Sequence, residues 1–276
     1  MILSSTFIGK SPPHSFNKTR ALNQMNKFLL LSFSILILIS FSCKKNKIDK
    51  EDNKCLMTKS SYDIGLADKV EFTYTYDAKK RVISKLRSEG GYKRYSTYVY
   101  TETEIIEKVE SFIKDKPSDV YTYVYRIGYE GRIDFMKYKS DNAEGLFIYT
   151  YDKEGYLIKI VSSNSKDASK HQVNFTYTDN TMIEQSDDTG TYITTFSKTK
   201  APNNYLFTEY PDYPQFSILH KYFGKRNNYL ISAFGRLSSQ NDLIYTYKYD
   251  NKSNIISSTA KSSESTIVRN TSYSCN

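Results

Sequence analysis

The sequence predicts an all-β protein, an antiparallel meander of about eight repeated hairpins that curves into a barrel or half-barrel. Three observations support this prediction. Aromatic residues alternate with Thr, Ile or Val along short segments, as expected where one face of a strand is buried. Asp begins several of the turns that follow these segments, and Gly comes three residues later in the clearest copies. The combination recurs about every 24 residues, which is the signature of repeated supersecondary units.

The clearest hairpin lies in residues 147–161. Its first strand places Tyr149 and Tyr151 on one face, because successive side chains of a strand point to opposite sides of the sheet. Asp152 then favours the first position of a turn, and Gly155 tolerates the positive φ that closes a hairpin with a bulge. The β-branched and aliphatic residues that follow predict the returning strand.

Copies of this hairpin recur along the chain. Positions equivalent to Asp152 are occupied by Asp77, Thr101, Gly128, Thr178 and Asp250. The interval from 178 to 250 has room for two degraded copies, and within it Asn203–Leu206 and Asn227–Leu230 share the sequence Asn-Asn-Tyr-Leu, 24 residues apart. Tyr-rich strands resemble one another by composition alone, but the even spacing favours true repetition.

Residues 201–224 interrupt the alternation. The segment Tyr210–Phe216 contains two prolines, which cannot donate hydrogen bonds within a sheet. Apolar residues at helical spacing follow it. We therefore expect a loop and then a short helix near 216–223, which covers one face of the sheet.

Residues 1–42 are expected to be an upstream extension and a signal peptide. Lys27 and the apolar run 28–41 have the charge and length of a signal peptide, and the run is too short for an ordinary membrane span. Both Met1 and Met25 remain candidates for the true start.

The apolar run ends in Ser-Phe-Ser-Cys43-Lys-Lys, which resembles a bacterial lipobox. The resemblance implies that Cys43 is lipidated and becomes the mature N-terminus, and that the lipid anchors the protein in the outer membrane, on its periplasmic or cell-surface face. A plain secretory signal with an incidental Cys is the alternative. Residues 43–54 are charged and predict a flexible tether, and residues 55–276 predict a single repeat-built β domain.

Two cysteines remain after Cys43. Cys55 lies at the start of the predicted domain and Cys275 lies next to the last residue. An even number of cysteines in an exported protein favours a disulfide, so we expect a bond that ties the first strand to the last. Two unrelated thiols are the alternative.

The sequence contains no recognisable catalytic or metal-binding motif. His14 lies upstream of the predicted mature protein, and His171 and His220 lie on separate elements, so a His-rich zinc site is not expected. Asp152 and Asp250, like Asp77, are expected to form turns rather than to act in catalysis. The formal net charge is +9, but Lys and Arg are scattered, whereas nucleic-acid binding needs a basic stripe. We therefore expect a non-enzymatic protein without a cofactor, a metal or a nucleic-acid partner.

The chain has 26 Tyr and no Trp, and this abundance allows two interpretations. Rows of Tyr on strands are expected mainly to form core and cross-strand pairs. Aromatic rings also stack on sugars, and the Pro-braced loop presents Tyr210, Tyr213 and Phe216, which are our candidate ligand-binding residues. A carrier or binder of a carbohydrate or apolar ligand, on an aromatic-lined concave face, is thus the alternative to a structural module.

The lipobox, the Tyr-x-Tyr-Asp hairpins and the segment Tyr222–Tyr229 together resemble an uncharacterised lipoprotein family of the Bacteroidota, a domain of unknown function with a porin-like fold. The turns are also similar to the tyrosine–aspartate repeats of Rhs-type proteins, although Lys80 and Ser253 stand where those repeats keep Gly. The resemblance implies a cell-envelope lipoprotein of unknown molecular activity.

A membrane-spanning barrel would need a continuous apolar band on its outer side. Charged residues occur in the middle of many predicted strands, so we expect the domain to lie outside the bilayer. We therefore expect a binding or structural module that contacts the membrane through its lipid anchor and has an envelope protein or a glycan as its partner.

Overall fold

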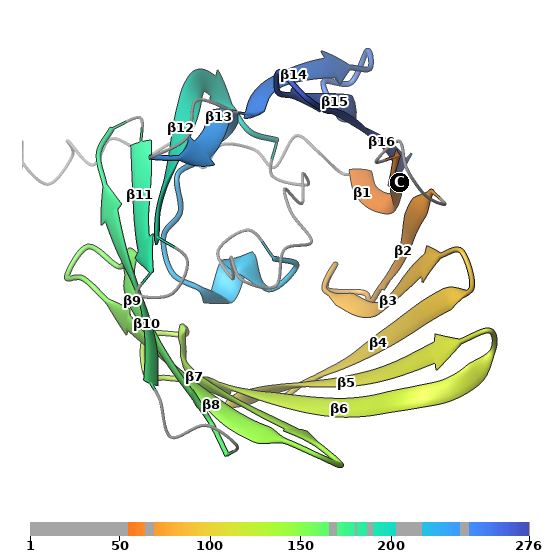
Figure 1. Cartoon of the computed structure of the whole chain (residues 1–276), viewed down its shortest axis with the longest axis vertical. Helices are drawn as coiled ribbons and strands as arrows, with labels where there is room; N and C mark the ends of the chain where they lie inside the picture. The colour runs from red at the N-terminus through yellow and green to blue at the C-terminus, as the bar shows by residue number, and fades with distance from the viewer. Residues whose placement is uncertain are drawn as a thin grey trace, which may run out of the picture. The chain divides into compact units, whose positions relative to one another are not determined.

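The described part of the chain forms a closed, antiparallel β-barrel of sixteen strands (Figure 1). This computed structural model describes residues 55–63, 69–165, 170–179, 181–186, 190–202, 217–237 and 243–275. Each strand pairs with the next along the chain, and β1 pairs with β16 to close the ring. The predicted antiparallel meander is confirmed, and of the two predicted shapes the half-barrel is wrong. No helix within these ranges is long and apolar enough to cross a bilayer.

The strands follow the alternation of aromatic and polar residues in the sequence. In β2, Phe72 and Tyr74 are buried on the inner face, while Thr73 and Thr75 between and after them are exposed. The strands are β1 Cys55–Asp63, β2 Val70–Tyr76, β3 Val82–Glu89, β4 Tyr92–Tyr100, β5 Glu104–Ile113, β6 Lys116–Ile127, β7 Ile133–Ser140, β8 Glu144–Tyr151, β9 Leu157–Asn164, β10 Lys170–Tyr177, β11 Thr181–Ser186, β12 Gly190–Lys200, β13 Tyr229–Arg236, β14 Leu243–Tyr249, β15 Ile255–Lys261 and β16 Thr266–Cys275.

The two ends of the barrel differ. One end, which we name the seam end, holds Cys55, Cys275 and the turns that follow β2, β4, β6, β8, β10 and β14, because all neighbouring strands are antiparallel. The other end, which we name the mouth, holds the turns that follow β3, β5, β7 and β15. The start of β1 and the end of β16 therefore both lie at the seam end.

Asp side chains build three of the turns at the seam end. Asp77 Oδ1 accepts hydrogen bonds from the backbone N–H groups of Lys79 and Arg81, both at 2.9 Å. Asp152 and Asp250 each accept the equivalent bond, at 2.8 Å, from the N–H of the residue four positions later. The expectation that these carboxylates form turns is therefore confirmed.

A residue with positive φ completes four of these turns, three positions after the turn begins. The residues are Lys80, Gly131, Gly155 and Ser253, with φ of 60°, 71°, 94° and 62°. The strand that follows each of the four turns carries a bulge after its first residue pair. Lys80 and Ser253 adopt a backbone conformation that favours Gly, because their Cβ atoms crowd the following carbonyl.

The prediction of eight hairpins with a common period is not confirmed. Between β12 and β13 the chain makes one long connection where two degraded repeats were expected. Of the two Asn-Asn-Tyr-Leu copies, Asn227–Leu230 leads into strand β13, and Asn203–Leu206 lies outside the described residues. The ring nevertheless closes with every neighbouring pair of strands antiparallel, because β1 pairs with β16 across the seam.

Residues 217–228 of that connection, which we name the inner segment, lie inside the ring of strands (Figure 1). They contain a single 3-10 turn, His220–Tyr222, so the helix expected near 216–223 is not confirmed beyond that turn. Leu219 and Phe223, on either side of the turn, are buried.

Six tyrosines fasten neighbouring strands near the seam end. Each donates its hydroxyl to the main-chain carbonyl of a buried apolar residue on the adjacent strand, at 2.6 to 3.0 Å. The pairs are Tyr76 with Met57, Tyr100 with Val82, Tyr151 with Ile133, Tyr177 with Leu157, Tyr247 with Ile231 and Tyr273 with Ile255. We name these six residues the tyrosine belt. Burial raises the pKa of Tyr76 and Tyr151, among others, so these hydroxyls stay protonated and act as donors.

The outer wall of the barrel is largely polar. Ion pairs join Lys59 to Glu71 at 3.0 Å and Lys108 to Glu110 at 2.7 Å, and all four side chains are about a third to a half exposed. Thr and Ser occupy many of the other outward positions, and exposed aliphatic residues such as Val99 are interspersed among them. A membrane-spanning barrel has the opposite pattern, with apolar residues outside and polar residues inside.

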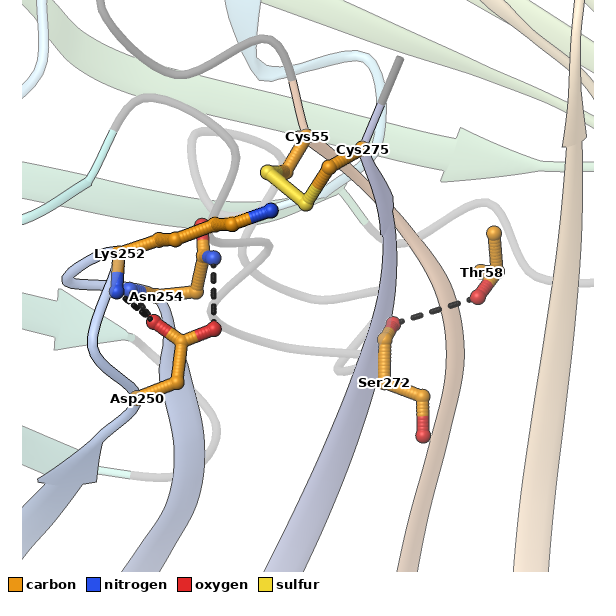
Figure 2. The surroundings of a disulfide bond; sticks show 7 residues. All are labelled: Cys55, Thr58, Asp250, Lys252, Asn254, Ser272 and Cys275. Atoms are coloured by element: carbon orange, nitrogen blue, oxygen red, sulfur yellow. Dashed lines mark hydrogen bonds between the residues drawn. A yellow bond between two sulfur atoms is a disulfide. The ribbon is translucent and has the colours of Figure 1, made fainter.

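Cys55 and Cys275 form a disulfide, as predicted (Figure 2). The bond joins the first residue of β1 to the last residue of β16, which are paired in the strand register. Thr58, three residues further along β1, donates a hydrogen bond to the Ser272 carbonyl at 3.4 Å, beside a bulge in β1 (Figure 2). The disulfide therefore lies on the seam where the ring closes.

Candidate ligand-binding site on the inner wall

A row of aromatic rings lines the inner wall on strands β6, β7 and β8. Tyr121, Tyr123 and Tyr125 stack along β6, with ring centroids 6.3 and 6.4 Å apart. Tyr138 on β7 lies 6.1 Å from Tyr123, and Phe147 on β8 lies 6.2 Å from Tyr138. We name these five residues the aromatic row. The rings form a continuous surface that crosses three strands.

The strand register explains how the row is assembled. Tyr123 is opposite Tyr138, so both rings point to the same face of the sheet. Tyr138 is in turn opposite Gly145, and a Cβ at Gly145 would lie 2.3 Å from the Tyr138 ring. Gly145 therefore leaves the space that the Tyr138 ring occupies, which is how an aromatic residue covers a glycine on the neighbouring strand.

The row differs from the tyrosine belt in its hydroxyl groups and not in burial, because residues of both sets are half-buried. Tyr121, Tyr123, Tyr138 and Phe147 are half-buried. Within the described part of the chain, the hydroxyls of Tyr121 and Tyr138 have no hydrogen-bond partner and remain available.

A groove of about 680 Å³ over β6 to β9 is lined mainly by residues that point to the face opposite the aromatic row, such as Val124, Lys137 and Leu146, and it also includes Tyr138 and Gly145. A second groove of about 590 Å³, over β9 to β11, is lined by polar residues such as Lys159 and Gln172 and holds no aromatic ring. Of these two grooves, the first includes one member of the aromatic row, Tyr138.

The seam-end side of the row is held by a buried carboxylate. Glu107 on β5 is 8% exposed, and it accepts hydrogen bonds from the hydroxyls of Tyr98 at 2.7 Å and Tyr125 at 2.9 Å. Burial and the negative charge of Glu107 raise the pKa of both phenols, so they stay protonated. Both oxygens of Glu107 are therefore used to fix ring positions.

Two guanidinium groups adjoin the row on the side of the mouth. Arg87 on β3 and Arg94 on β4 are directly opposite in the register and share the inner face. Arg87 forms an ion pair with Glu89, and its guanidinium carbon lies 5.8 Å from the centre of the Tyr92 ring. The Arg94 guanidinium is close enough to the hydroxyl of Tyr123, a member of the row, for the two groups to interact electrostatically.

Arg94 stays charged although it is partly desolvated. Burial alone would lower the pKa of its guanidinium, but Tyr123, Tyr92 and Glu107 outweigh burial and hold the pKa above its ordinary value. The inner wall therefore presents a fixed positive charge next to the aromatic row.

The inner segment packs against the barrel at the seam end. Tyr222 stacks on Tyr100, with centroids 6.2 Å apart, and Phe223 contacts the Tyr149 ring edge-on at 5.1 Å. The backbone N–H of Lys225 donates to a carbonyl of the turn after β8, at 2.8 Å. These contacts place the inner segment against the seam end and leave the aromatic row on the side of the mouth.

The predicted ligand-binding residues lie outside the described residues. Tyr210, Tyr213 and Phe216 belong to this group, and so does Cys43, the predicted site of lipidation. Their roles stay predictions.

The described residues also bear on metal binding. His171 lies on β10 and His220 in the 3-10 turn, and within the described residues no group of three or more His, Cys, Asp or Glu is placed to hold a metal ion.

Sequence reasoning did not single out the inner-wall site. The alternation of Tyr121, Tyr123 and Tyr125 was visible, but the same alternation marks Tyr residues that are fully committed to the core. Two features separate the row from the belt. Each belt hydroxyl donates to a carbonyl, whereas those of Tyr121 and Tyr138 have no such partner within the described residues, and Arg94 lies beside Tyr123 two strands away. Both depend on the closed ring and its register.

Two solved structures have a similar fold. A porin-like protein from Bacteroides uniformis ATCC 8492 is 15% identical, with a TM-score of 0.59, over 79% of this chain and 96% of that chain. A porin-like protein from Bacteroides vulgatus ATCC 8482 is 12% identical, with a TM-score of 0.52, over 79% of this chain and 99% of that chain. No protein-family model and no curated protein matches the chain. At these identities the likeness shows the fold alone.

Proposed function

We propose that the protein is a non-enzymatic binding module of the cell envelope, which holds a saccharide against the aromatic row. The observation that carries the proposal is the row itself, in which half-exposed rings follow one another across β6 to β8. Flat aromatic faces stack on the apolar faces of sugar rings, and nearby phenol hydroxyls hydrogen-bond to sugar hydroxyls.

The distribution of side chains favours a saccharide over an acyl chain. The aliphatic residues of the inner face, such as Ile133 and Leu157, are fully buried beside the tyrosine belt. The half-buried part of the wall at the row consists mainly of tyrosine rings, together with Phe147, Arg94 and Glu89. An acyl chain would need an apolar lining, whereas a sugar needs rings and hydrogen-bonding groups together.

The proposal of a non-enzymatic role is supported by how the acidic side chains are used. Asp77, Asp152 and Asp250 are hydrogen-bonded to the backbone of their own turns. Glu107 is engaged by two tyrosines. None of these carboxylates points freely at the aromatic row.

The proposed location rests on the lipobox at Cys43 and on the polar outer wall. A lipid at Cys43 would hold the barrel beside the outer membrane, with its charged outer face in water. The porin-like neighbours from Bacteroides are compatible with such an envelope protein. Intact mass of the protein purified from its native membrane tests this part, because lipidation predicts a chain that begins at an acylated Cys43.

Binding is tested by titrating the full-length detergent-solubilised protein with a panel of short neutral and acidic oligosaccharides. Tyrosine fluorescence reports binding directly, since the chain has no Trp. Tyr138→Ala removes a central ring of the row and should weaken binding by about 30-fold, the usual cost of truncating an aromatic anchor. Tyr95→Ala is the matched control, because Tyr95 is 40% exposed on the outer wall.

The proposal fails if no member of the panel binds, or if Tyr138→Ala binds as tightly as the unaltered protein. Thermal unfolding checks that both variants fold, and Tyr138→Leu, which keeps apolar volume without a ring, serves if the Ala variant does not. A barrel that binds no saccharide would instead be a structural component of the envelope.

A further inference from the structure

We propose that the saccharide held on the inner wall is acidic, and that its carboxylate binds between Arg87 and Arg94. This inference rests on the proposed function, since it names the chemical class of the ligand for the same site. It adds an anion subsite at the mouth-side end of the aromatic row.

The first argument is the placement of two like charges. Arg87 and Arg94 are directly opposite each other on one face of an antiparallel pair, an arrangement that is destabilising because the guanidinium groups repel. Glu89 forms an ion pair with Arg87. Arg94 has no carboxylate within ion-pair distance in the described part of the chain, and the negative charge that acts on it is that of the buried Glu107, whose two oxygens are already engaged by tyrosines.

The second argument is the supply of donors. A guanidinium group presents a planar fork that matches a carboxylate and binds it through two parallel hydrogen bonds. Arg87 Nε is buried and has no hydrogen-bond partner within the described residues. The Arg87 side chain as a whole is 34% exposed, so a ligand can reach the group from the mouth.

The third argument is that the guanidinium groups are held in place. Tyr92 lies under Arg87, and Phe72 lies on its other flank, with the guanidinium carbon 6.0 Å from the ring centre. Arg94 is half-buried and interacts with the hydroxyl of Tyr123. Groups that are already oriented lose little conformational entropy when a ligand binds, so they favour recognition of a defined anion.

The fourth argument is continuity with the aromatic row. Arg94 contacts Tyr123, and the Tyr123 ring lies 6.1 Å from the Tyr138 ring. The anion subsite and the stacking surface are therefore adjacent parts of one site. A sugar that carries a carboxylate meets both, because its ring stacks on the row while its acid group reaches the arginine pair.

The test compares an oligogalacturonate with the same oligosaccharide after chemical reduction of its carboxyl groups. The two probes have the same ring geometry and differ in charge. We expect the acidic probe to bind at least about tenfold more tightly, with a difference that shrinks as salt is added. Arg94→Gln should weaken binding of the acidic probe about tenfold and leave the reduced probe unchanged.

Lys93→Gln is the matched control. Lys93 is the neighbour of Arg94 on β4 but points to the outer face, where it is ion-paired with Asp115 at 2.7 Å. It should leave the affinity for both probes unchanged. Arg94→Lys keeps the charge but not the fork, and it provides a second variant if the Gln variant does not fold.

Equal affinity for the two probes, or an Arg94→Gln variant that still prefers the acidic one, would overturn the anion subsite and leave the proposed saccharide function standing. Failure of both probes and of the neutral panel would overturn the saccharide function itself. A short single-stranded DNA that competes as well as the oligogalacturonate would show a general polyanion site and contradict the assignment to an acidic sugar.

Discussion

The hydroxyl of Tyr151 on β8 donates a 2.6 Å hydrogen bond to the carbonyl oxygen of Ile133 on β7. Ile133 is fully buried, so this carbonyl has no access to water when the phenol is absent. The same relationship recurs five more times around the barrel. The belt thus satisfies backbone groups near the bulges, where the ordinary ladder of hydrogen bonds is interrupted.

Removing one belt hydroxyl should lower stability. Tyr151→Phe keeps the ring but leaves the Ile133 carbonyl without its partner, so we expect the free energy of unfolding to fall by about 1 to 2 kcal/mol. Urea denaturation followed by circular dichroism measures the change. Tyr95→Phe on the outer wall is the control and should change stability by less than about 0.5 kcal/mol. Equal stability of the two variants would mean that the hydrogen bonds of the tyrosine belt do not contribute to the stability of the barrel.

Relieving backbone strain in a turn should raise stability. Ser253 has φ of 62°, which costs an L-residue about 1 kcal/mol, so Ser253→Gly should stabilise the barrel by roughly that amount. Ser253→Ala keeps the Cβ and should give no gain. Gly155→Ala should destabilise, because its φ is 94° and the new Cβ would lie 2.6 Å from an Arg132 nitrogen. Chemical denaturation of the three variants decides, and a Ser253→Ala variant as stable as the Gly variant would contradict the explanation.

Removing the disulfide at the seam should lower the free energy of unfolding by more than any of the single side-chain changes above. The disulfide closes a loop of 220 residues, for which loop-closure entropy predicts a loss of about 5 kcal/mol when the bond is absent. Cys55→Ser, Cys275→Ser and the double variant should have the same reduced stability, because each removes the same bond. The midpoints of urea unfolding, measured for the unaltered protein with and without reductant, report the effect. Equal midpoints under the two conditions would contradict it.

The inner segment should make the barrel sensitive to acid through His220. Burial, and after it the positive charge of Arg226, lower the pKa of His220 to about 3, while its Nδ1–H donates to the Ser217 carbonyl at 2.9 Å. Between the ordinary pKa of 6.5 and about 3, His220 binds a proton in the unfolded chain but stays neutral in the folded protein. Stability is therefore full above about pH 6.5 and falls on acidification toward pH 3, by at most about 1.4 kcal/mol per pH unit.

The measurement for His220 is the dependence of the unfolding free energy on pH, compared between the unaltered protein and His220→Gln. The variant lacks the titrating group, so its slope between pH 6.5 and pH 4 should be smaller. Parallel curves would mean that His220 is solvated or already protonated in the folded state.

Much of the fold could be predicted from local patterns. Alternation at Phe72 and Tyr74, the Asp–backbone turns and the pairing of Cys55 with Cys275 all depend on residues that are close in sequence or on the parity of cysteines. The eight-fold repeat is not confirmed, because Asn227–Leu230 leads into β13, whereas its copy Asn203–Leu206 lies outside the described residues. The short helix was overestimated because apolar residues at positions 219 and 223 bury equally well around a single 3-10 turn.

The inner-wall site could not be predicted, because it depends on register and closure. Tyr121 and Tyr151 have the same local sequence environment of alternating polar and aromatic residues, yet Tyr151 belongs to the belt and Tyr121 to the row. Which of them donates its hydroxyl to a neighbouring carbonyl is decided by position along the barrel axis. The opposition of Arg87 and Arg94 likewise follows from the register of one hairpin.

The pairing of β1 with β16 has a consequence for how the protein is made. A chain synthesised from its N-terminus contains β1 first and β16 last. The edge of β1 therefore stays unpaired until the ten residues of β16 have been made. An open strand edge invites pairing with other chains, and contacts across 220 residues form slowly. The disulfide between Cys55 and Cys275, which needs an external oxidant to accept two electrons from the two thiols, can therefore form only after β16 has been made, so it distinguishes chains that contain both strands of the seam from chains that lack the second.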